Sequence, residues 1–401
     1  MYCFINPFYL QLLVASGISL GVEGHSQTLV ETRDAMNANH RYPLRIMMPA
    51  MVNILLHRKS PIKVGLQLTN KCNLDCRFCY FRDDAHQHGQ VLSTQEIYTV
   101  IDDLKKMNIS ILALTGGEPL LREDHLDILR YCTRRKILTG IATNGTLLTR
   151  ELVREHRRAG LAWYHLSIDG ASDDAQSASR GPGVFRKVDA AIDLMRENGI
   201  DIIATTVVSR ENQHSLRQIA NYINGKGIKI WSPTIVLPCG KAKEYLKNNL
   251  FTKDEIRAIY GEIYELGRTY GKTLAVFPMD SQIYYPYVVL QEKPSWIKKK
   301  MYGFMGGCSV VKGTTVHINY DGSVKPCSYF SGVVPGANVK NKSIIDIFRN
   351  DPYLIGLRDR SRLKGACRDC SYLYCCAGCR SRGAALFDDP FAEDVYCIYK
   401  Q

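Results

Sequence analysis

Between residues 62 and 236, short apolar runs alternate with longer segments in which apolar residues recur every three or four positions. Short apolar runs bounded by loops are typical of buried strands, and the wider spacing is typical of helices that bury one face. The pattern predicts six strands: Ile62–Leu68, Ile111–Thr115, Ile137–Ala142, Tyr164–Ile168, Ile202–Val208 and Lys229–Val236. Because predicted strands and helices alternate, we expect the strands to lie parallel, joined by helical crossovers.

Three of the predicted helices have clear end signals. The segments beginning at Ser93 and Thr252 are capping boxes, in which a hydroxyl and a glutamate three residues later satisfy backbone N–H groups. Val184–Asn198 has apolar residues at helical spacing and is followed by Gly199, which suits the left-handed conformation after a helix. In parallel sheets with helical crossovers, active sites lie at the carboxyl ends of the strands, so functional residues are expected directly after the apolar runs.

Composition supports a globular protein. With 401 residues, 45% apolar and 23% charged, the chain is long enough for two or three domains with sizeable cores. The formal charge of +13 gives information about partners rather than about the fold. Nucleic acid, an acidic electron-donor protein and a polycarboxylate substrate all fit this charge. The longest basic run, Lys298–Lys300, is too short to favour nucleic acid. The apolar stretch Phe8–Val22 is shorter than the ~18–20 residues of a membrane span and lacks a basic n-region, so we predict neither a transmembrane segment nor a secretory signal.

The fourteen cysteines favour metal binding over disulfides, because many stand at C-x2-C spacings and no signal peptide is apparent. Cys72, Cys76 and Cys79 form C-x3-C-x2-C directly after the first apolar run, with no fourth cysteine nearby. A structural zinc site needs four protein ligands, whereas a reactive cluster benefits from one iron without a protein ligand. The alternatives are a zinc knuckle short of one ligand and unrelated core cysteines. Three isolated cysteines are predicted to be small buried hydrophobic residues: Cys3, Cys132 and Cys239.

Polar and glycine-rich motifs follow the next strands in turn. They are Thr115-Gly116-Gly117-Glu118-Pro119, Thr143-Asn144-Gly145, Ser167-Ile168-Asp169-Gly170, Arg180-Gly181 and Val207-Val208-Ser209. Paired glycines let a backbone approach a ligand closely, Glu118 offers an acceptor for an ammonium group, and Arg180 can pair with a carboxylate. Each motif alone is typical of a tight turn, but their order after successive strands indicates one binding site.

A second cysteine array occupies the C-terminal part. Cys308, Gly322 and Cys327 read C-x13-G-x4-C, with a turn at Asn319–Gly322 between two short β-like runs. Further along stand Cys367, Cys370, Cys375, Cys376, Cys379 and Cys397. Thiolates at such spacings bind zinc or iron–sulfur clusters, so a pair of zinc ribbons is the competing interpretation.

These motifs together resemble the radical S-adenosylmethionine (radical SAM) superfamily. The resemblance implies a partial (β/α)6 TIM-like barrel with a C-terminal cysteine-rich iron–sulfur extension. It implies that Cys72, Cys76 and Cys79 hold a catalytic 4Fe-4S cluster whose fourth iron is chelated by SAM. The other cofactor-binding residues that it implies are Tyr80, Gly116, Gly117, Glu118, Asn144, Ser167, Asp169, Arg180 and Val208. Relatives often carry a His-Asp pair a few residues before this arginine, Arg180, where this chain has Gln176 and Ser177. Because the pair is absent, Arg180 is the one residue of this segment to which the resemblance assigns a cofactor-binding role.

The second array resembles the SPASM extension, which implies one or two auxiliary Fe–S clusters. Relatives with two place Cys308, Cys327 and Cys379 on one, and Cys367, Cys370, Cys376 and Cys397 on the other. Cys376 is favoured over Cys375 because it keeps the x5 spacing from Cys370. No further cysteine follows shortly after Cys308, so the first auxiliary cluster is expected to have an open or non-cysteine site.

The substrate is suggested by the last part of the chain. Cys376–Ala385 and Asp389–Asp394 resemble the radical SAM proteins of alternative haem and haem d1 biosynthesis, which trim acetate or propionate side chains from iron tetrapyrroles. The resemblance implies a cytoplasmic enzyme with an anionic tetrapyrrole substrate and a ferredoxin- or flavodoxin-type electron donor, without nucleic acid. A peptide or protein maturase is the alternative, and a zinc-ribbon nucleic-acid-binding protein is the remote one.

We expect four segments along the chain. They are an N-terminal segment of unknown role (1–58), the barrel core (59–240), a helical connector (241–306) and the auxiliary cluster domain (307–401).

Overall fold

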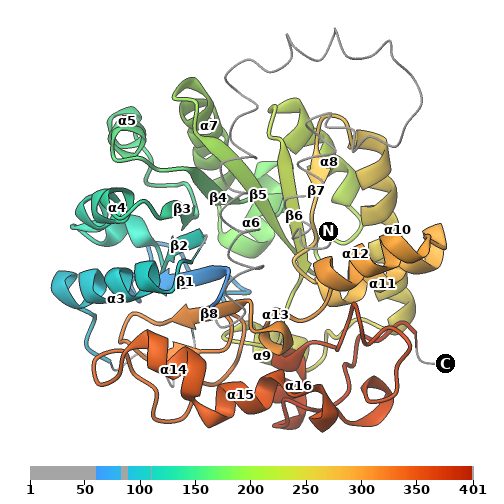
Figure 1. The fold of residues 1–401 in the computed structure, drawn as a ribbon. Helices are drawn as coiled ribbons and strands as arrows, with labels where there is room; N and C mark the ends of the chain where they lie inside the picture. The colour runs from blue at the N-terminus through green and yellow to red at the C-terminus, as the bar shows by residue number, and fades with distance from the viewer. Residues whose placement is uncertain (1–59, 83–88, 110, 400–401) are drawn as a thin grey trace, which may run out of the picture.

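The computed structural model describes residues 60–82, 89–109 and 111–399. All six predicted strands are present, with ends within one residue of the prediction. They are β1 Lys63–Gln67, β2 Ile111–Thr115, β3 Leu138–Thr143, β4 Trp163–Ser167, β5 Asp201–Val208 and β6 Ile230–Ile235. Each pairs in parallel with the next (Figure 1). The predictions for residues 1–58, which include Phe8–Val22 and Cys3, lie outside the described residues.

Three short strands extend the sheet at its two ends. β7 (Ala275–Val276) pairs in parallel with β6, β8 (Thr315–Ile318) pairs in parallel with β1, and β9 (Val324–Lys325) pairs antiparallel with β8. The strand order is β7-β6-β5-β4-β3-β2-β1-β8-β9. Because β7 and β9 stand at opposite ends of this order, the sheet is open, and the predicted partial barrel is confirmed. The sequence predicted two β-like runs at β8 and β9, but not that they would join the barrel sheet.

Helices cover the outer face of the curved sheet (Figure 1). They are α3 Thr94–Lys106, α4 His125–Arg134, α5 Arg150–Arg158, α7 Val184–Glu197, α8 Leu216–Gly225 and α10 Lys253–Tyr270. α6 Asp173–Arg180 follows β4, and its last two residues, Ser179 and Arg180, face the inside of the barrel. Both predicted capping boxes are present, at Ser93 and Thr252. Gly199 follows α7 with a φ of 62°, the left-handed conformation predicted for it.

The rest of the chain packs beside α10 and β7 and below the barrel (Figure 1). It contains α9 Ala242–Leu246, α11 Ser281–Glu292, α12 Trp296–Met305, α13 Ser309–Lys312, α14 Ile344–Asn350, α15 Pro352–Arg358 and α16 Arg380–Phe387. Within the described ranges, no helix has the length and apolar character needed to cross a bilayer.

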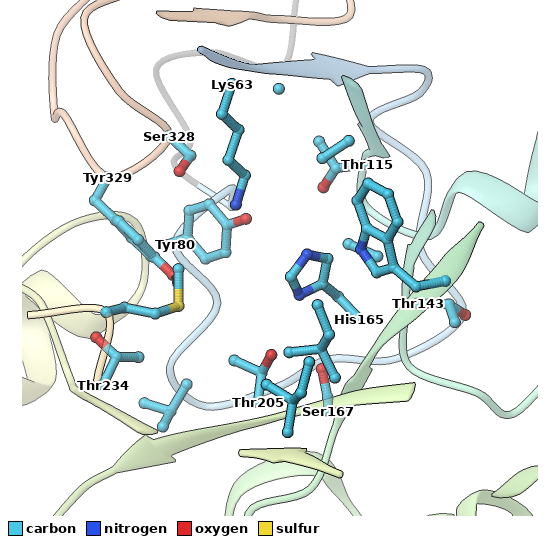
Figure 2. A pocket seen from close by; sticks show the side chains of 18 of the residues that line it. Lys63, Tyr80, Thr115, Thr143, His165, Ser167, Thr205, Thr234, Ser328 and Tyr329 are labelled. Carbon is cyan, nitrogen blue, oxygen red and sulfur yellow. Dashed lines mark hydrogen bonds between the residues drawn. The ribbon is translucent and has the colours of Figure 1, made fainter. Parts of the chain in front are cut away.

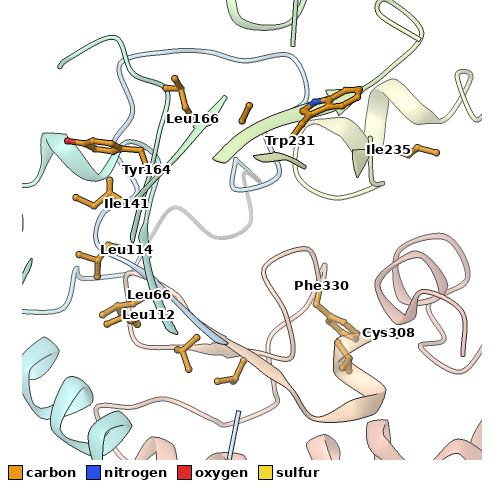
Figure 3. Packing of buried hydrophobic residues seen from close by; sticks show 14 of the residues in the cluster. Leu66, Leu112, Leu114, Ile141, Tyr164, Leu166, Trp231, Ile235, Cys308 and Phe330 are labelled. Carbon is orange, nitrogen blue, oxygen red and sulfur yellow. The ribbon is translucent and has the colours of Figure 1, made fainter. Parts of the chain in front are cut away.

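Alternate residues of the strands face different environments. Leu66, Leu114, Tyr164 and Leu166 are fully buried on the helix-covered side of the sheet (Figure 3). Burying each such side chain stabilises the fold by roughly 1.5–3 kcal/mol. The residues between them face inward and line a cavity. Parallel strands covered on both faces are apolar throughout, so the polar residues on the inner face of these strands mark an interior kept open for a ligand.

Candidate active site

A cavity of about 1210 Å³ occupies the inside of the barrel. Most of the predicted SAM-site residues line it: Cys72, Cys76, Cys79, Tyr80, Gly116, Gly117, Asn144, Ser167, Asp169 and Arg180. They come from loops after four different strands. Glu118 and Val208, in contrast, are fully buried and do not line the cavity.

The C-x3-C-x2-C loop presents three free, partly exposed thiols to this cavity. Burial raises the pKa of the Cys72 and Cys76 thiols, and the nearby charge of Arg180 opposes that rise at Cys76. Arg180 Nη1 lies 3.9 Å from Cys76 Sγ. A guanidinium beside the thiol favours the thiolate, which is the form that binds iron.

The thiols suit a cluster better than a single ion. Among the described residues, no three His, Cys, Asp or Glu side chains are placed to hold one metal ion. In a 4Fe-4S cluster each thiolate binds its own iron, so the ligands stand farther apart than around one ion. Three thiols from one loop, facing one cavity beside a cation, fit the predicted cluster.

Asp169, after β4, organises the wall beside this loop. Its carboxylate accepts hydrogen bonds from Arg180 Nε (2.7 Å), Ser179 Oγ (3.0 Å) and the Val207 N–H (2.8 Å). Gln176 is fully buried, and its Oε1 accepts from the backbone N–H groups of Asp169 and the following residue. Gln176 therefore holds the loop after β4. The sequence showed this position only as a departure from relatives, and no local signal indicated its structural role.

Glu118 links two of the motifs from behind the cavity wall. Its carboxylate accepts from Thr143 Oγ1 (2.8 Å) and the Asn144 N–H (2.9 Å), and burial raises its pKa to about 7. A Cβ on Gly117 would lie 2.3 Å from the Lys71 carbonyl oxygen, so this glycine lets the loop after β2 contact the backbone just before Cys72. The Gly-Gly-Glu segment thus positions the cysteine loop. Its predicted contact with the amino group of SAM stays a prediction.

The inner face of the barrel carries nitrogen-bearing side chains that the sequence analysis missed. Lys63 and His165 point into the cavity (Figure 2). Burial lowers the pKa of Lys63, which forms no ion pair among the described residues. Burial, helped by the Lys63 charge, lowers the pKa of His165 to about 3. Two buried ring nitrogens, Trp163 Nε1 and His317 Nε2, have no hydrogen-bond partner in the described part of the chain. Lys63 and His165 could have been found from the sequence, because they are polar residues at alternate positions of the predicted strands.

The first auxiliary group shares the main cavity. Cys308, Cys327 and Cys379 all line it. Tyr80, directly after Cys79, contacts Tyr329, two residues after Cys327, with ring centroids 4.8 Å apart and the rings tilted by 48°. Tyr80, which was predicted to bind the cofactor, thus contacts an aromatic residue of the C-terminal extension.

The second auxiliary group surrounds its own small cavity. Cys367, Cys370, Cys376 and Cys397 line this space of about 20 Å³. Cys375 is fully buried outside it, whereas Cys376 faces it. The structure therefore brings together the four cysteines that the resemblance placed on one cluster.

The surroundings of Arg380 indicate whether an anionic cluster fits the second auxiliary group. Its guanidinium is fully buried, Nη1 donates to the Pro390 carbonyl (2.6 Å), and Nε and Nη2 have no partner among the described residues. A Cβ on Gly378 would lie 2.6 Å from Arg380 Nη2 and 3.2 Å from Cys367 Sγ, so both atoms lie close to one point. A buried cation without a partner is costly, and an iron–sulfur cluster on these thiolates would supply the missing negative charge.

A buried ion network fastens the extension to the barrel. Asp394 accepts from the Cys379 N–H (2.7 Å) and from Arg382 Nη2 (2.7 Å). Arg382 Nη1 also donates to Asp280 (3.1 Å), which accepts from the Ile235 N–H (2.8 Å) at the end of β6. Burial alone would raise the pKa of Asp394. The charge and hydrogen bonds of Arg382 have the larger combined effect and hold the pKa of that carboxyl below its ordinary value.

Comparisons with known proteins agree with this arrangement. A model of the radical SAM superfamily matches residues 66–223, and a model of the SPASM iron-sulfur cluster-binding domain matches residues 308–371. The match to an iron–sulfur domain argues against the zinc-ribbon alternative.

Curated relatives and solved structures extend the comparison. An AdoMet-dependent heme synthase of Methanosarcina barkeri is 30% identical over 346 residues, covering 85% of this chain and 97% of the relative. A pre-heme d1 synthase of Dinoroseobacter shibae is 25% identical, covering 82% and 84%. The Streptococcus suis SuiB structure bound to its precursor peptide SuiA shares the fold, with a TM-score of 0.69 at 17% identity over 96% of this chain and 90% of SuiB.

Proposed function

This chain belongs to the radical SAM superfamily and carries a SPASM iron–sulfur domain, and we propose that it modifies carboxyalkyl side chains of an anionic iron tetrapyrrole. The observation that supports this substrate most directly is Lys63, whose amine lies inside the barrel cavity without a carboxylate partner in the described residues. The likeness to a heme synthase over most of both chains points to the same class of substrate.

The cofactor residues are proposed as follows. Cys72, Cys76 and Cys79 hold the 4Fe-4S cluster, and the loops after β2, β3 and β4 hold SAM. When bound, this pair supplies a 5′-deoxyadenosyl radical that abstracts hydrogen from an unactivated C–H bond. Arg180 favours the thiolate of Cys76, and Asp169 orients Arg180 through a 2.7 Å ion pair.

The cavity wall supplies binding and orientation for the substrate. A buried lysine without a partner favours its neutral form, and an incoming carboxylate restores its charge. Trp163 and His317 also line this cavity, and their ring nitrogens Nε1 and Nε2 have no hydrogen-bond partner among the described residues. Tyr80 and Tyr329 line the same cavity and offer flat apolar faces. This combination suits a flat macrocycle with acidic side chains. The formal charge of +13 also suits an acidic ferredoxin- or flavodoxin-type electron donor.

The decisive experiment is mass spectrometry of candidate iron tetrapyrroles after anaerobic turnover with SAM. We expect the loss of carboxyalkyl mass from one of them, together with release of 5′-deoxyadenosine. Cys76→Ala is the control for cluster-dependent chemistry and should abolish both. If no tetrapyrrole loses mass while a precursor peptide is modified, the protein is a peptide maturase instead.

Binding tests the role of Lys63 separately from turnover. Lys63→Met should weaken binding of a carboxylated iron porphyrin about tenfold, because a hydrogen bond to a charged group contributes about 1.5–3 kcal/mol. Lys63→Arg should retain most of the affinity. Lys247→Met, which removes an exposed lysine paired with Glu244, is the matched control and should leave binding unchanged. Equal affinity for all of these variants would remove Lys63 from the substrate site.

A further inference from the structure

Cys239, which the sequence left as an isolated hydrophobic residue, lies among the cysteines of the first auxiliary group. It is 3% exposed and follows β6 in a loop of the barrel. It forms a small buried cluster with Leu237 and Cys379, against which Tyr80 and Tyr329 pack. One buried cluster therefore contains a cysteine of the barrel and a cysteine of the C-terminal extension.

Several other thiols lie near Cys239. Cys327, Cys379 and Cys79 all lie within electrostatic range of its sulfur. Cys308 lies within the same range of both Cys327 and Cys379. Cys239 also lines the main cavity together with these three cysteines of the extension. Cys239 thus packs against one cysteine of the extension, Cys379, and lines the same cavity as Cys308 and Cys327.

The first auxiliary group has one cysteine fewer than a fully cysteine-ligated cluster requires. A 4Fe-4S cluster in which every iron has a cysteine ligand takes four thiolates, one for each iron. The second auxiliary group has four cysteines around one space, whereas the motif of the extension supplies only Cys308, Cys327 and Cys379 to the first. Burial raises the pKa of the Cys239 thiol, and the nearby positive charge of Lys325 opposes that rise.

The backbone fixes where Cys239 lies. The Cys239 N–H donates to the Leu237 carbonyl (2.8 Å), and the Lys241 N–H donates to the Cys79 carbonyl (3.0 Å). Gly240 has a φ of 56°, and a Cβ there would lie 2.3 Å from the Cys79 carbonyl oxygen. The loop is therefore held against the first cysteine motif, and its glycine allows the close approach.

We propose that Cys239 is the fourth thiolate ligand of the auxiliary iron–sulfur cluster held by Cys308, Cys327 and Cys379. The site then draws ligands from the barrel and from the extension, and it lies beside the loop of the SAM cluster. The inference rests on the proposed iron–sulfur ligands and is independent of the proposed substrate.

The test compares Cys239→Ala and Cys239→Ser with Cys132→Ala, all purified anaerobically. Cys132 is a matched control because it is fully buried in α4 and does not line either cavity. Wild type and Cys132→Ala should carry roughly 12 irons in three clusters, whereas Cys239→Ala should lose about one to four. The electron paramagnetic resonance (EPR) signal of one auxiliary cluster should disappear and return when 2-mercaptoethanol supplies a thiolate.

Cys239→Ser keeps the test decisive if the alanine variant fails to fold. Serine is close in size to cysteine, so this variant should fold, and its oxygen ligand should shift the reduction potential of one auxiliary cluster. Full iron content with unchanged spectra and potentials in the Cys239 variants would overturn the inference. A wild-type protein without iron would instead overturn the proposed cluster sites as a whole, so the two failures are distinguishable.

Discussion

The buried carboxylate Asp394 is expected to hold the C-terminal extension on the barrel, and its replacement is the sharpest test of the fold. Asp394 is 5% exposed and accepts two hydrogen bonds from Arg382 (2.7 and 2.8 Å). It also accepts one each from the N–H groups of Cys379 (2.7 Å) and Tyr396 (3.1 Å). Arg382 is fully buried. Asp394→Ala would leave it with Asp280 as its remaining carboxylate among the described residues.

The magnitude follows from this geometry. Removing one partner of a buried ion pair costs about 3–5 kcal/mol, because the other charge stays buried and uncompensated. Asp394→Ala should therefore lower the free energy of unfolding by about that amount. Asp394→Asn keeps the volume and some hydrogen bonds but loses the charge, so a loss of about 1.5–3 kcal/mol is expected.

Urea unfolding of the anaerobic protein, followed by tryptophan fluorescence, measures these losses. Asp254→Ala is the control, since it removes an exposed pair with Arg257 (2.6 Å) and should cost under about 1 kcal/mol. Asp394→Ala should also lose iron from the first auxiliary cluster, because Asp394 holds the Cys379 backbone. A loss no larger than that of Asp254→Ala, with full iron content, would refute the reasoning.

Three other predictions follow from single contacts. Burial raises the pKa of Glu118 from 4.5 to about 7, so its contribution to stability is complete below pH 4.5 and is lost as the pH rises through about 7. Glu118→Gln should flatten the fall in unfolding free energy over that range, and an unchanged slope would contradict this. Gly378 has a φ of 61° and lies against Arg380, whereas Gly336 has a φ of 68° with nothing within 4 Å of its Cβ position. Gly336→Ala should cost about 1–2 kcal/mol and Gly378→Ala about 1–3 kcal/mol more, measured by urea unfolding; equal losses would refute the contact. Arg380→Met should lower the reduction potential of one auxiliary cluster by about 60 mV or more in an EPR-monitored titration, and unchanged potentials would show that Arg380 does not face a cluster.

Much of the fold was readable from local patterns. The six strands lie within one residue of their predicted ends, and both capping boxes form as predicted. These features depend on side chains close together in the chain, so their pattern is visible without a structure. The motifs after successive strands also met at one cavity, because parallel strands end at the same edge of a sheet.

Other features depend on residues far apart in the chain. Gly117 accommodates the backbone at Lys71, and Glu118 accepts hydrogen bonds from Thr143 and Asn144, two contacts that the sequence did not predict. Both contacts join loops from different strands, so spacing along the chain does not show them. The hairpin of β8 and β9 likewise gains its place from pairing with β1.

The sequence by itself therefore determined the elements, the family and the chemistry of the cysteine loop at Cys72–Cys79. The tertiary structure decided which distant groups share a space: Lys63 inside the barrel, Arg380 beside the second cysteine group and Cys239 beside the first. The physical reason is that periodicity and capping act over a few residues. Burial of charge and convergence of thiols, in contrast, arise only when the folded chain brings separate segments together.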